Sequence, residues 1–493
     1  MTALHRRTSR LLLLAAGVLL IGAGAASALA APLSAAQLQS DLQLARGALE
    51  EAHGGVYRYT PKADLDRVFD AAARKLDRPM EAIAFARILA PAVAALRCGH
   101  TAVLLSPALK AEMEQALLLP LDVKLLRGRL YILRDFDGAG KLAGREIVSI
   151  NGVAIGSVIE RLLAAAPGDG LITTGRAQRV ARKFKEELFI QFGMQGKFTL
   201  GLRAPKRESV TLAGQTLAAL RQASVNRYPQ DQHSHKFTEL SLLDGGKIAR
   251  LQVFNFTDEE EDDEGGAMLK KAFEKIEASG AQTLLLDLRD NGGGEDRLGK
   301  LVFSYLVEAP FPYYEALTVQ RERLSFAAHV EGSAVIPAAM LTARPDGLFA
   351  VKGHPNLGMQ KPSLPTFRGK VIALINGRSF STTAELITQL HDKQRATFVG
   401  EESGGAYHGN NSGNDVTLVL PNSDLRIAIP LVTYKLAVSG QHANGRGVVP
   451  EVEVLPRMQD YLAGRDVVLE RHWASHAHND LPPHSHGQSG NQE

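Results

Sequence analysis

Residues 284–294 read LLLDLRDNGGG, and this run decides the fold class. Its apolar half is typical of a buried strand. The three glycines that follow let the backbone adopt positive φ and present bare N–H groups. Such N–H groups bind a phosphate or the oxyanion of a tetrahedral intermediate. No Gly-Lys-Ser/Thr sequence and no dinucleotide-binding spacing follows, so the oxyanion is the better interpretation.

Strands and helices alternate on both sides of this run. Strands are predicted at 248–254, 283–288, 370–375 and 397–399, and helices at 268–278, 298–306 and 381–391. This order indicates βαβ units and an α/β layer structure. We therefore expect a core over residues 240–470, with the irregular, Pro-containing stretch 309–369 forming an excursion or lid beside it.

A second informative stretch, residues 375–386, reads INGRSFSTTAEL. Ser381 follows a strand and a turn and opens an amphipathic helix, where the helix dipole favours developing negative charge. The Thr382 N–H is there an unsatisfied first-turn donor. The arrangement is similar in logic to a nucleophile elbow, although the last glycine of that motif is missing. The alternative interpretation is that Ser381 only caps the helix.

Two further segments precede this core. Residues 34–108 have apolar residues at helical spacing and predict a helical N-terminal domain. Residues 116–214 change to strands, with an Asn151-Gly152 turn after an amphipathic strand, and predict a β-rich module.

Both ends of the chain are expected to lie outside the fold. Residues 1–30 combine a basic start, an apolar run and a small-residue cleavage site, which is typical of a signal peptide and leaves no stable membrane anchor after cleavage. We therefore expect an exported bacterial protein, periplasmic or secreted. Residues 471–493 form a His-rich tail that is expected to be disordered; a weakly held transition metal is the alternative for its histidines.

Composition excludes several classes of protein. The chain has 493 residues and a net charge of +3, so no strong attraction to nucleic acid is expected. A single cysteine, Cys98, excludes an internal disulfide framework and every multi-cysteine metal site.

Taken together, the motifs resemble peptidase family S41, which includes carboxy-terminal processing proteases, the tricorn core and retinoid-binding-protein modules. The resemblance covers most of the chain after residue 30. Its motifs, in chain order, are EAHGGVY (51–57), CGHT (98–101), GREIVSING (144–152), DLRDNGGG (287–294), RSFS (378–381), RAT (395–397), VGE (399–401) and GRGVVP (445–450). The resemblance implies a crotonase/ClpP-like spiral core, and it implies that the β-rich module is PDZ-like and binds extended peptides.

By this resemblance Ser381 is the nucleophile, with Thr382 as a minor rival. The processing-protease branch uses a lysine base about twenty-five residues after the serine, but here that place falls at Ala406. The tricorn-like branch takes a histidine from the segment that corresponds to Gly99–Thr101. His100 is therefore the expected general base, and His408, near the place of the missing lysine, is the alternative.

The third catalytic group is open. Tricorn-like sites have a glutamate where this chain has Asn444, and an asparagine orients an imidazole without stabilising its charge. Glu401, Glu402 and Asp392 are possible substitutes. The backbone N–H groups of Gly293 and Thr382 are expected to bind the oxyanion. No metal and no organic cofactor is implied.

These features predict an exported serine endopeptidase that acts on proteins or peptides through an acyl-enzyme on Ser381, with His100 as general base. The alternative is a non-catalytic peptide- or ligand-binding protein that retains the fold. A crotonase-type acyl-CoA enzyme is a third option, since it would share a glycine-built oxyanion hole.

Overall fold

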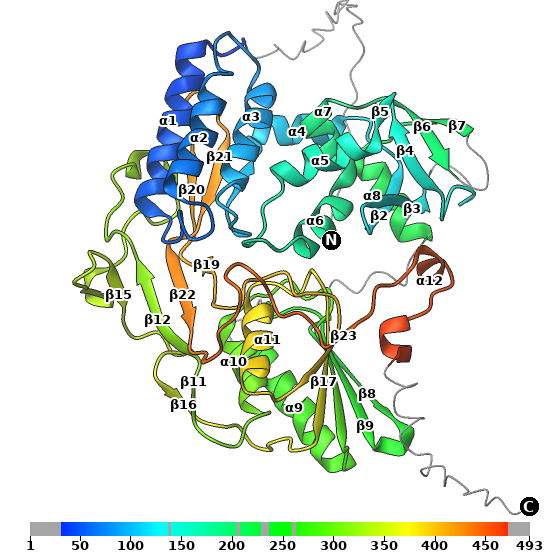
Figure 1. Cartoon of the computed structure of the whole chain (residues 1–493), viewed down its shortest axis with the longest axis vertical. Coiled ribbons are helices and arrows are strands. Elements are labelled where there is room, and N and C mark those ends of the chain that lie inside the picture. The colour runs from blue at the N-terminus through cyan, green and yellow to red at the C-terminus, as the bar shows by residue number, and fades with distance from the viewer. Residues whose placement is uncertain (1–30, 137–139, 204–207, 228–235, 259–262, 472–493) are drawn as a thin grey trace, which may run out of the picture.

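The computed structural model describes residues 31–136, 140–203, 208–227, 236–258 and 263–471. The expected signal peptide and nearly all of the His-rich tail therefore lie outside the described residues. Figure 1 shows three parts: helices α1–α3 beside strands β20 and β21, a module with strands β2–β7, and a parallel sheet with its helices. No helix in the described part of the chain is long and apolar enough to cross a membrane.

A six-stranded sheet forms the centre of the third part, in the order β23-β18-β17-β10-β9-β8. All neighbours are parallel except the pair of β8 and β9, so the predicted α/β fold is confirmed. The strands are β8 (Thr238–Leu243), β9 (Ile248–Val253), β10 (Thr283–Asp287), β17 (Lys370–Ile375), β18 (Thr397–Gly400) and β23 (Val452–Glu453).

The central strands β10 and β17 of this sheet are buried on both faces. Helices α9 (Glu264–Ser279), α10 (Asp296–Ser304) and α11 (Thr382–Asp392) cover one face (Figure 1). Leu284 and Leu286 belong to the apolar core on that side. Leu285 points to the other face, where it joins a smaller cluster that includes Val468. Burial on both faces explains why the sequence of this strand is apolar without alternation.

The first three helices, α1 (Ala35–Ala52), α2 (Lys62–Ala73) and α3 (Ala82–Ala94), have no separate core. Their buried residues are part of the same apolar cluster as the parallel sheet and its helices. The strand after them, β1 (Ala102–Leu104), pairs with β21 in the sheet β1-β21-β20-β13. The helical segment is thus structurally continuous with the core.

The module after them has its own core. Its sheet has the order β2-β3-β4-β6-β7, with β5 paired to β4, and the Asn151-Gly152 turn joins β4 to β5 as expected. The module contains β2 (Leu121–Leu126), β3 (Arg129–Asp135), β4 (Glu146–Ile150), β5 (Val153–Ala154), β6 (Lys197–Arg203), β7 (Glu208–Ala213), α5 (Ile155–Ala165), α6 (Thr174–Arg182) and α7 (Phe184–Phe192). Two helices flank it, α4 (Pro107–Gln115) and α8 (Leu217–Arg227).

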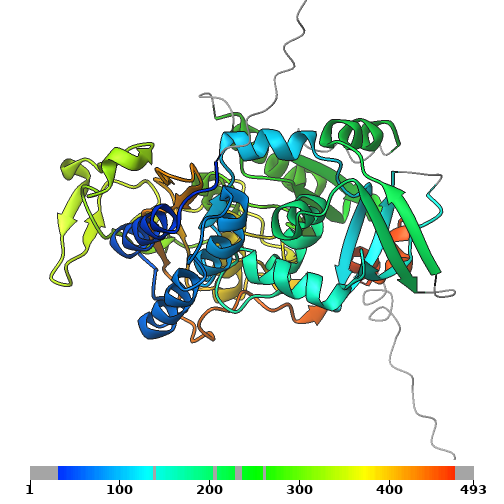
Figure 2. The same cartoon turned by 90° about the horizontal axis from the view of Figure 1, so that it is seen from above.

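The stretch 309–369 is more ordered than predicted. Three of its strands, β12, β14 and β15, join a five-stranded sheet of order β14-β15-β12-β22-β19, which extends to one side of the molecule in Figure 2. Its short, Pro- and Gly-interrupted strands hide the period-two pattern in the sequence. The remaining elements are β11 (Phe311–Pro312), β12 (Tyr314–Val319), β13 (Val330–Glu331), β14 (Leu341–Ala343), β15 (Phe349–Val351), β16 (Met359–Gln360), β19 (Asn411–Ser412), β20 (Val416–Val419), β21 (Arg426–Ile429), β22 (Val432–Leu436) and α12 (Met458–Leu462).

A buried carboxylate fixes the helical segment to this core. Asp41 of α1 is fully buried, and its oxygens accept hydrogen bonds from Asn422 N and Nδ2 (3.2 and 2.8 Å) and from Ser423 N and Oγ (2.8 and 2.6 Å). Asp41 therefore closes the turn between β20 and β21 from a position 381 residues earlier in the chain.

We predict that Asp41→Ala destabilises the protein by about 3 kcal/mol, because buried donors lose a charged acceptor. Urea denaturation followed by circular dichroism measures this change. The control is Asp64→Ala on α2, whose carboxylate is 46% exposed and pairs with Arg67. It should cost less than about 1 kcal/mol. Equal effects of the two substitutions would contradict the role of Asp41.

Candidate active site

Two loops meet at one edge of the parallel sheet. Strands β10 and β17 are direct neighbours, and Asp287 lies opposite Leu374 in the register. The glycine-rich run 290–294 and the turn 376–381 follow the carboxyl ends of these two strands. Because carboxyl ends of parallel strands point to the same edge, both loops lie side by side, where ligands of such sheets usually bind.

Ser381 has the backbone geometry of a nucleophile elbow. Its φ is 56° and its ψ is −130°, a region that residues other than glycine rarely adopt. It stands at the N-cap position of α11, yet its side chain accepts no hydrogen bond from the helix. The hydroxyl is therefore not used for capping. The sharp turn between strand and helix instead directs it outward.

Buried polar contacts hold the turn in this shape. Ser379 is fully buried, and its hydroxyl donates to Leu288 O (2.8 Å) and accepts from Asn376 N (3.1 Å). Phe380 N donates to Asn291 O (3.1 Å), which connects the turn to the glycine-rich loop. These bonds join the ends of β10 and β17 and offset the strain at Ser381.

Gly293 touches the nucleophile through its backbone. A Cβ atom at this position would lie 2.6 Å from Ser381 Cβ and 3.1 Å from Thr382 N, and the φ of Gly293 is +100°. The Gly293 N–H donates to Asn291 Oδ1 at 2.9 Å. Contrary to the prediction, it is thus not free to bind an oxyanion, because the Asn291 side chain folds back onto it.

Thr382 retains the expected donor. Its N–H has no acceptor among the described residues, as is usual in the first turn of a helix. Its side-chain hydroxyl is buried and donates to Gly294 O at 2.6 Å. That bond anchors α11 to the glycine-rich loop and leaves Ser381, not Thr382, with the available hydroxyl.

His100 lies beside Ser381, although 281 positions separate them in the chain. His100 Nε2 is 3.1 Å from Ser381 Oγ. The imidazole stacks on the Phe380 ring, with a centroid distance of 4.6 Å and an interplanar angle of 29°. His100 comes from the loop between α3 and β1, so the pairing of β1 with β21 delivers it to the end of the parallel sheet.

The other nitrogen of the ring is buried without a partner. His100 Nδ1 has no hydrogen-bond partner among the described residues. Desolvation lowers the pKa of His100, and Arg179 lowers it further, whereas the charges of Asp169 and Asp415 raise it. The imidazole is therefore neutral near pH 7, the form that a general base requires.

Asp169 is the site residue that sequence reasoning missed. It lies between α5 and α6 of the module, is 2% exposed, and accepts hydrogen bonds from Gly99 N (2.7 Å) and Ala406 N (3.3 Å). Asp169 thereby joins the loop that carries His100 to the loop that carries Ala406. Its only sequence signal is the Gly168-Asp169-Gly170 turn, which resembles many surface turns.

The two groups expected to orient the ring, Asn444 and Glu402, and the alternative base His408 form no hydrogen bond with His100 among the described residues. Both oxygens of Glu402 pair with Arg446 (2.7 and 2.8 Å), and Oε1 also accepts from Gly447 N. Asn444 is exposed and has no hydrogen-bond partner in the described part of the chain. The His408 ring packs against Tyr407. In this structure each of these groups is engaged elsewhere or faces outward, so none of them holds the ring of His100.

The other carboxylates are also engaged. Glu401 Oε2 accepts from Gly377 N at 3.1 Å, and Asp392 Oδ1 accepts from Ser439 N at 2.7 Å. Glu401 supports the elbow turn and Asp392 closes a distant loop. Neither reaches His100.

The helix that follows Ser381 is buried over most of its length and carries one carboxyl group inward. Glu385 accepts from Asn410 Nδ2 (2.8 Å), and its Oε2 lies 2.7 Å from the Tyr314 hydroxyl, which is also 3.0 Å from Asp296 Oδ2. Burial and the charge of Asp296 raise the pKa of Glu385 to about 7. One hydroxyl proton satisfies one acceptor, so a protonated Glu385 completes this network beneath the elbow.

Cys98, His100 and Asp169 are the one group of potential metal ligands found among the described residues, with ligand atoms within 4.8 Å of one another. Burial raises the pKa of Cys98 to about 12, which disfavours the thiolate that a metal needs. Both oxygens of Asp169 already accept backbone N–H groups. The chemistry of this group fits hydrogen bonding better than metal binding.

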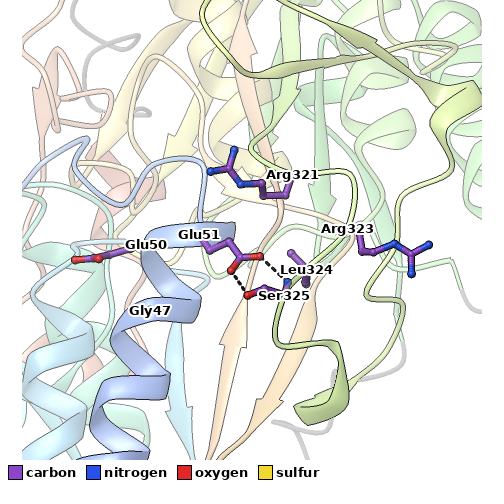
Figure 3. Close-up of a pocket in the computed structure, with 7 residues that line it drawn as sticks. All are labelled: Gly47, Glu50, Glu51, Arg321, Arg323, Leu324 and Ser325. Carbon is purple, nitrogen blue, oxygen red and sulfur yellow. Dashed lines mark hydrogen bonds between the residues drawn. The ribbon is translucent and has the colours of Figure 1, made fainter.

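A separate hollow of about 590 Å³ lies between the end of α1 and residues 321–325 (Figure 3). Glu51 crosses it and accepts from Ser325 N (2.7 Å) and from the Ser325 hydroxyl. Arg323 points away from this contact in Figure 3. Neither Ser381 nor His100 lines the hollow. The contact of Glu51 with Ser325 joins α1 to the segment before β13.

Comparisons with known proteins find similarity to a peptidase family and to solved structures of the same fold. Residues 247–454 match the family model of peptidase family S41. None of the curated proteins matches the chain. Among solved structures, mature CPAF is similar at 16% identity with a TM-score of 0.60, covering 91% of this chain and 99% of its own.

Mature CPAF complexed with lactacystin is similar at 17% identity with a TM-score of 0.61, and the match covers 90% of this chain and 99% of that protein. The photosystem II D1 C-terminal processing protease is 16% identical with a TM-score of 0.41, and the match covers 85% of this chain and 93% of that protein. At these identities the likeness is one of fold.

We predict that Gly293→Ala abolishes the reactivity of Ser381 while the fold is retained. A methyl group at this position collides with Ser381 Cβ and strains the backbone. Labelling of Ser381 by a fluorophosphonate should fall by about 10²-fold or more. The control is Gly156→Ala on α5, where a Cβ meets nothing within 4 Å. It should label at the rate of the unaltered chain. Normal labelling of Gly293→Ala would show that the close approach is unimportant.

Proposed function

We propose that the chain is a serine endopeptidase, because residues 247–454 match the family model of peptidase family S41. One observation carries the proposal: His100 Nε2 lies 3.1 Å from the hydroxyl of a serine in a strained elbow. A neutral imidazole at hydrogen-bond distance from a serine is the arrangement that activates the hydroxyl for acyl transfer.

The reaction follows from these positions. Ser381 Oγ attacks the peptide carbonyl carbon while His100 Nε2 accepts the hydroxyl proton. The imidazolium then gives this proton to the leaving amine, the C–N bond breaks, and an ester of Ser381 remains. Water then attacks the ester while His100 Nε2 accepts its proton. The imidazolium gives this proton to Ser381 Oγ as the C–O bond breaks, which releases the acid and restores the serine hydroxyl.

The Thr382 N–H at the start of α11 is the protein's donor for the oxyanion of each tetrahedral intermediate. It has no other acceptor, and the dipole of the eleven-residue helix adds positive potential at its end. Gly293 contributes space: without a side chain, its backbone leaves the carbonyl room to approach Ser381.

Asp169 is a positioning residue in this proposal. Its charge stabilises the imidazolium form of His100 from the direction of the module. Its two backbone hydrogen bonds fix the loop of His100 against the loop of Ala406. A negative charge that acts without touching the ring partly replaces the glutamate that the chain lacks at Asn444.

The proposal includes the location of the enzyme and its substrate. The character of residues 1–30 supports export to the periplasm or the medium. The substrate is a protein or peptide, and the β-rich module, whose residue Asp169 contacts the loop of His100, is the part proposed to hold an extended peptide.

A second candidate function is a non-catalytic peptide-binding protein of the same fold. It is favoured by the buried His100 Nδ1, which has no acceptor for the proton that an active tautomer carries there. The measurement below distinguishes the two.

We expect a fluorophosphonate probe to label the chain, since the probe reacts with activated serines. Ser381→Ala should abolish labelling, and His100→Ala should slow it by about 10²–10⁴-fold through loss of the general base. His408→Ala, which alters the alternative base, should label normally. Labelling of Ser381→Ala would place the nucleophile elsewhere, and an unlabelled native chain would favour the binding function.

The pH dependence of kcat/KM should have an acid limb below pH 6.5, because desolvation lowers the pKa of His100 from that value and only the neutral ring accepts a proton. Asp169→Asn removes a charge that raises this pKa, so the limb should move to lower pH. Arg179→Gln removes a charge that lowers it, so the limb should move to higher pH. Shifts in the same direction would show that His100 does not control the limb.

A further inference from the structure

A cavity of about 290 Å³ opens next to the candidate active site. Gly99 and Phe380, which precede His100 and Ser381 in the chain, both line it. The backbones of Gly377 and Gly404 border it as well. A group bound here therefore contacts the residues that directly precede the two reacting side chains in the chain.

The lining of this cavity is strongly basic. It contains four basic side chains and no acidic one: Arg179, Arg182, Lys183 and Arg378. The net charge of the whole chain is only +3. Four cations in so small a space therefore represent a local concentration of positive charge and not the general character of the molecule.

The packing of α6 on the elbow turn brings these cations together. A Cβ on Gly175, in the first turn of α6, would lie 3.1 Å from Gly377 O, so the two segments are in close contact. Arg179, one turn further, donates from Nη2 to Gly99 O at 3.2 Å. Arg182 lies near the end of the same helix, and Arg378 comes from the elbow turn itself.

Protein carboxylates neutralise this charge only in part. Arg378 reaches Asp290 at 3.5 Å, and that carboxylate is 64% exposed. Arg182 and Lys183 form no ion pair within the described part of the chain. Glu187 and Asp169 compensate Arg179 electrostatically. Desolvation lowers the pKa of Arg378, and the neighbouring charge of Arg182 lowers it further.

Arg179 and Arg378 are half-buried, whereas Arg182 and Lys183 are exposed at the edge of the cavity. The charge of Arg182 acts against both half-buried guanidinium groups, and an anion that joins these cations relieves the repulsion. The planar forks of Arg179, Arg182 and Arg378 are suited to a carboxylate, which accepts two parallel hydrogen bonds from such a group.

We propose, on the premise of the peptidase function above, that this cavity is a specificity subsite that binds a carboxylate of the substrate. The carboxylate belongs either to an Asp or Glu side chain near the cleaved bond or to the carboxyl end of the peptide. The shared chemistry is a carboxylate held between α6 and the elbow turn by Arg179, Arg182, Lys183 and Arg378.

The test begins with binding to Ser381→Ala, which cannot turn substrate over. Fluorescence anisotropy compares matched peptides that carry Glu or Gln at each position in turn, each with a free or an amidated carboxyl end. One of the acidic forms should bind about tenfold or more tightly than its neutral partner. A Glu-over-Gln preference identifies the side chain, and an acid-over-amide preference identifies the chain end.

The ratio of the affinities for the acidic and the neutral peptide is then measured with variants that change the charge of the cavity. Arg182→Glu and the pair Arg182→Gln with Lys183→Gln should reduce the preference to less than about twofold, whatever the change in overall affinity. Arg221→Gln on α8 removes an exposed cation of the same chain that does not line the cavity, and should keep the preference. Circular dichroism confirms that each variant is folded.

The outcomes separate the two proposals. If the native chain cleaves peptides but no acidic form is preferred, or if the preference survives in Arg182→Glu, the subsite is wrong and the peptidase function remains. If Ser381→Ala binds acidic forms selectively through these cations while the native chain neither cleaves nor labels, the subsite is correct and the peptidase function is wrong.

Discussion

The site depends on the parallel pairing of β10 with β17. This pairing places a glycine-rich loop and a sharp serine turn at the same sheet edge, so close that Gly293 has no room for a Cβ atom beside Ser381. Buried bonds from Ser379 to Leu288 O and from Phe380 to Asn291 O hold the two loops together. Strain at one residue is thus maintained by a rigid sheet below it.

The rest of the site comes from parts of the chain that lie outside this sheet. The helical segment carries His100 on the loop before β1, and the module contributes Asp169 and Arg179, which bind the backbone of Gly99 on either side. An imidazole, its neighbouring carboxylate and a serine therefore come from three structural parts. The contacts of the module with Gly99 therefore form part of the surroundings of His100.

Much of the fold follows from local pattern. The apolar run ending at Asp287, the strand at 370–375 and the amphipathic helix after Ser381 are visible in the sequence because each has a clear period and a clear end. The strands between 309 and 369 are not visible, since they are short and interrupted. Asn444 and Glu402 were reasonable expectations from motif position, but their side chains are exposed or paired with Arg446.

The sequence by itself determined the α/β class and the turn that carries Ser381, because these depend on residue type and spacing within short segments; His100 was expected only from the resemblance to family S41. Only the tertiary structure decided which carboxylate lies near the histidine and that the N–H of Gly293 is already bonded to Asn291. It also decided that cations of α6 converge with Arg378 on one cavity. These are contacts between segments far apart in the chain, and no local pattern encodes which segments will meet.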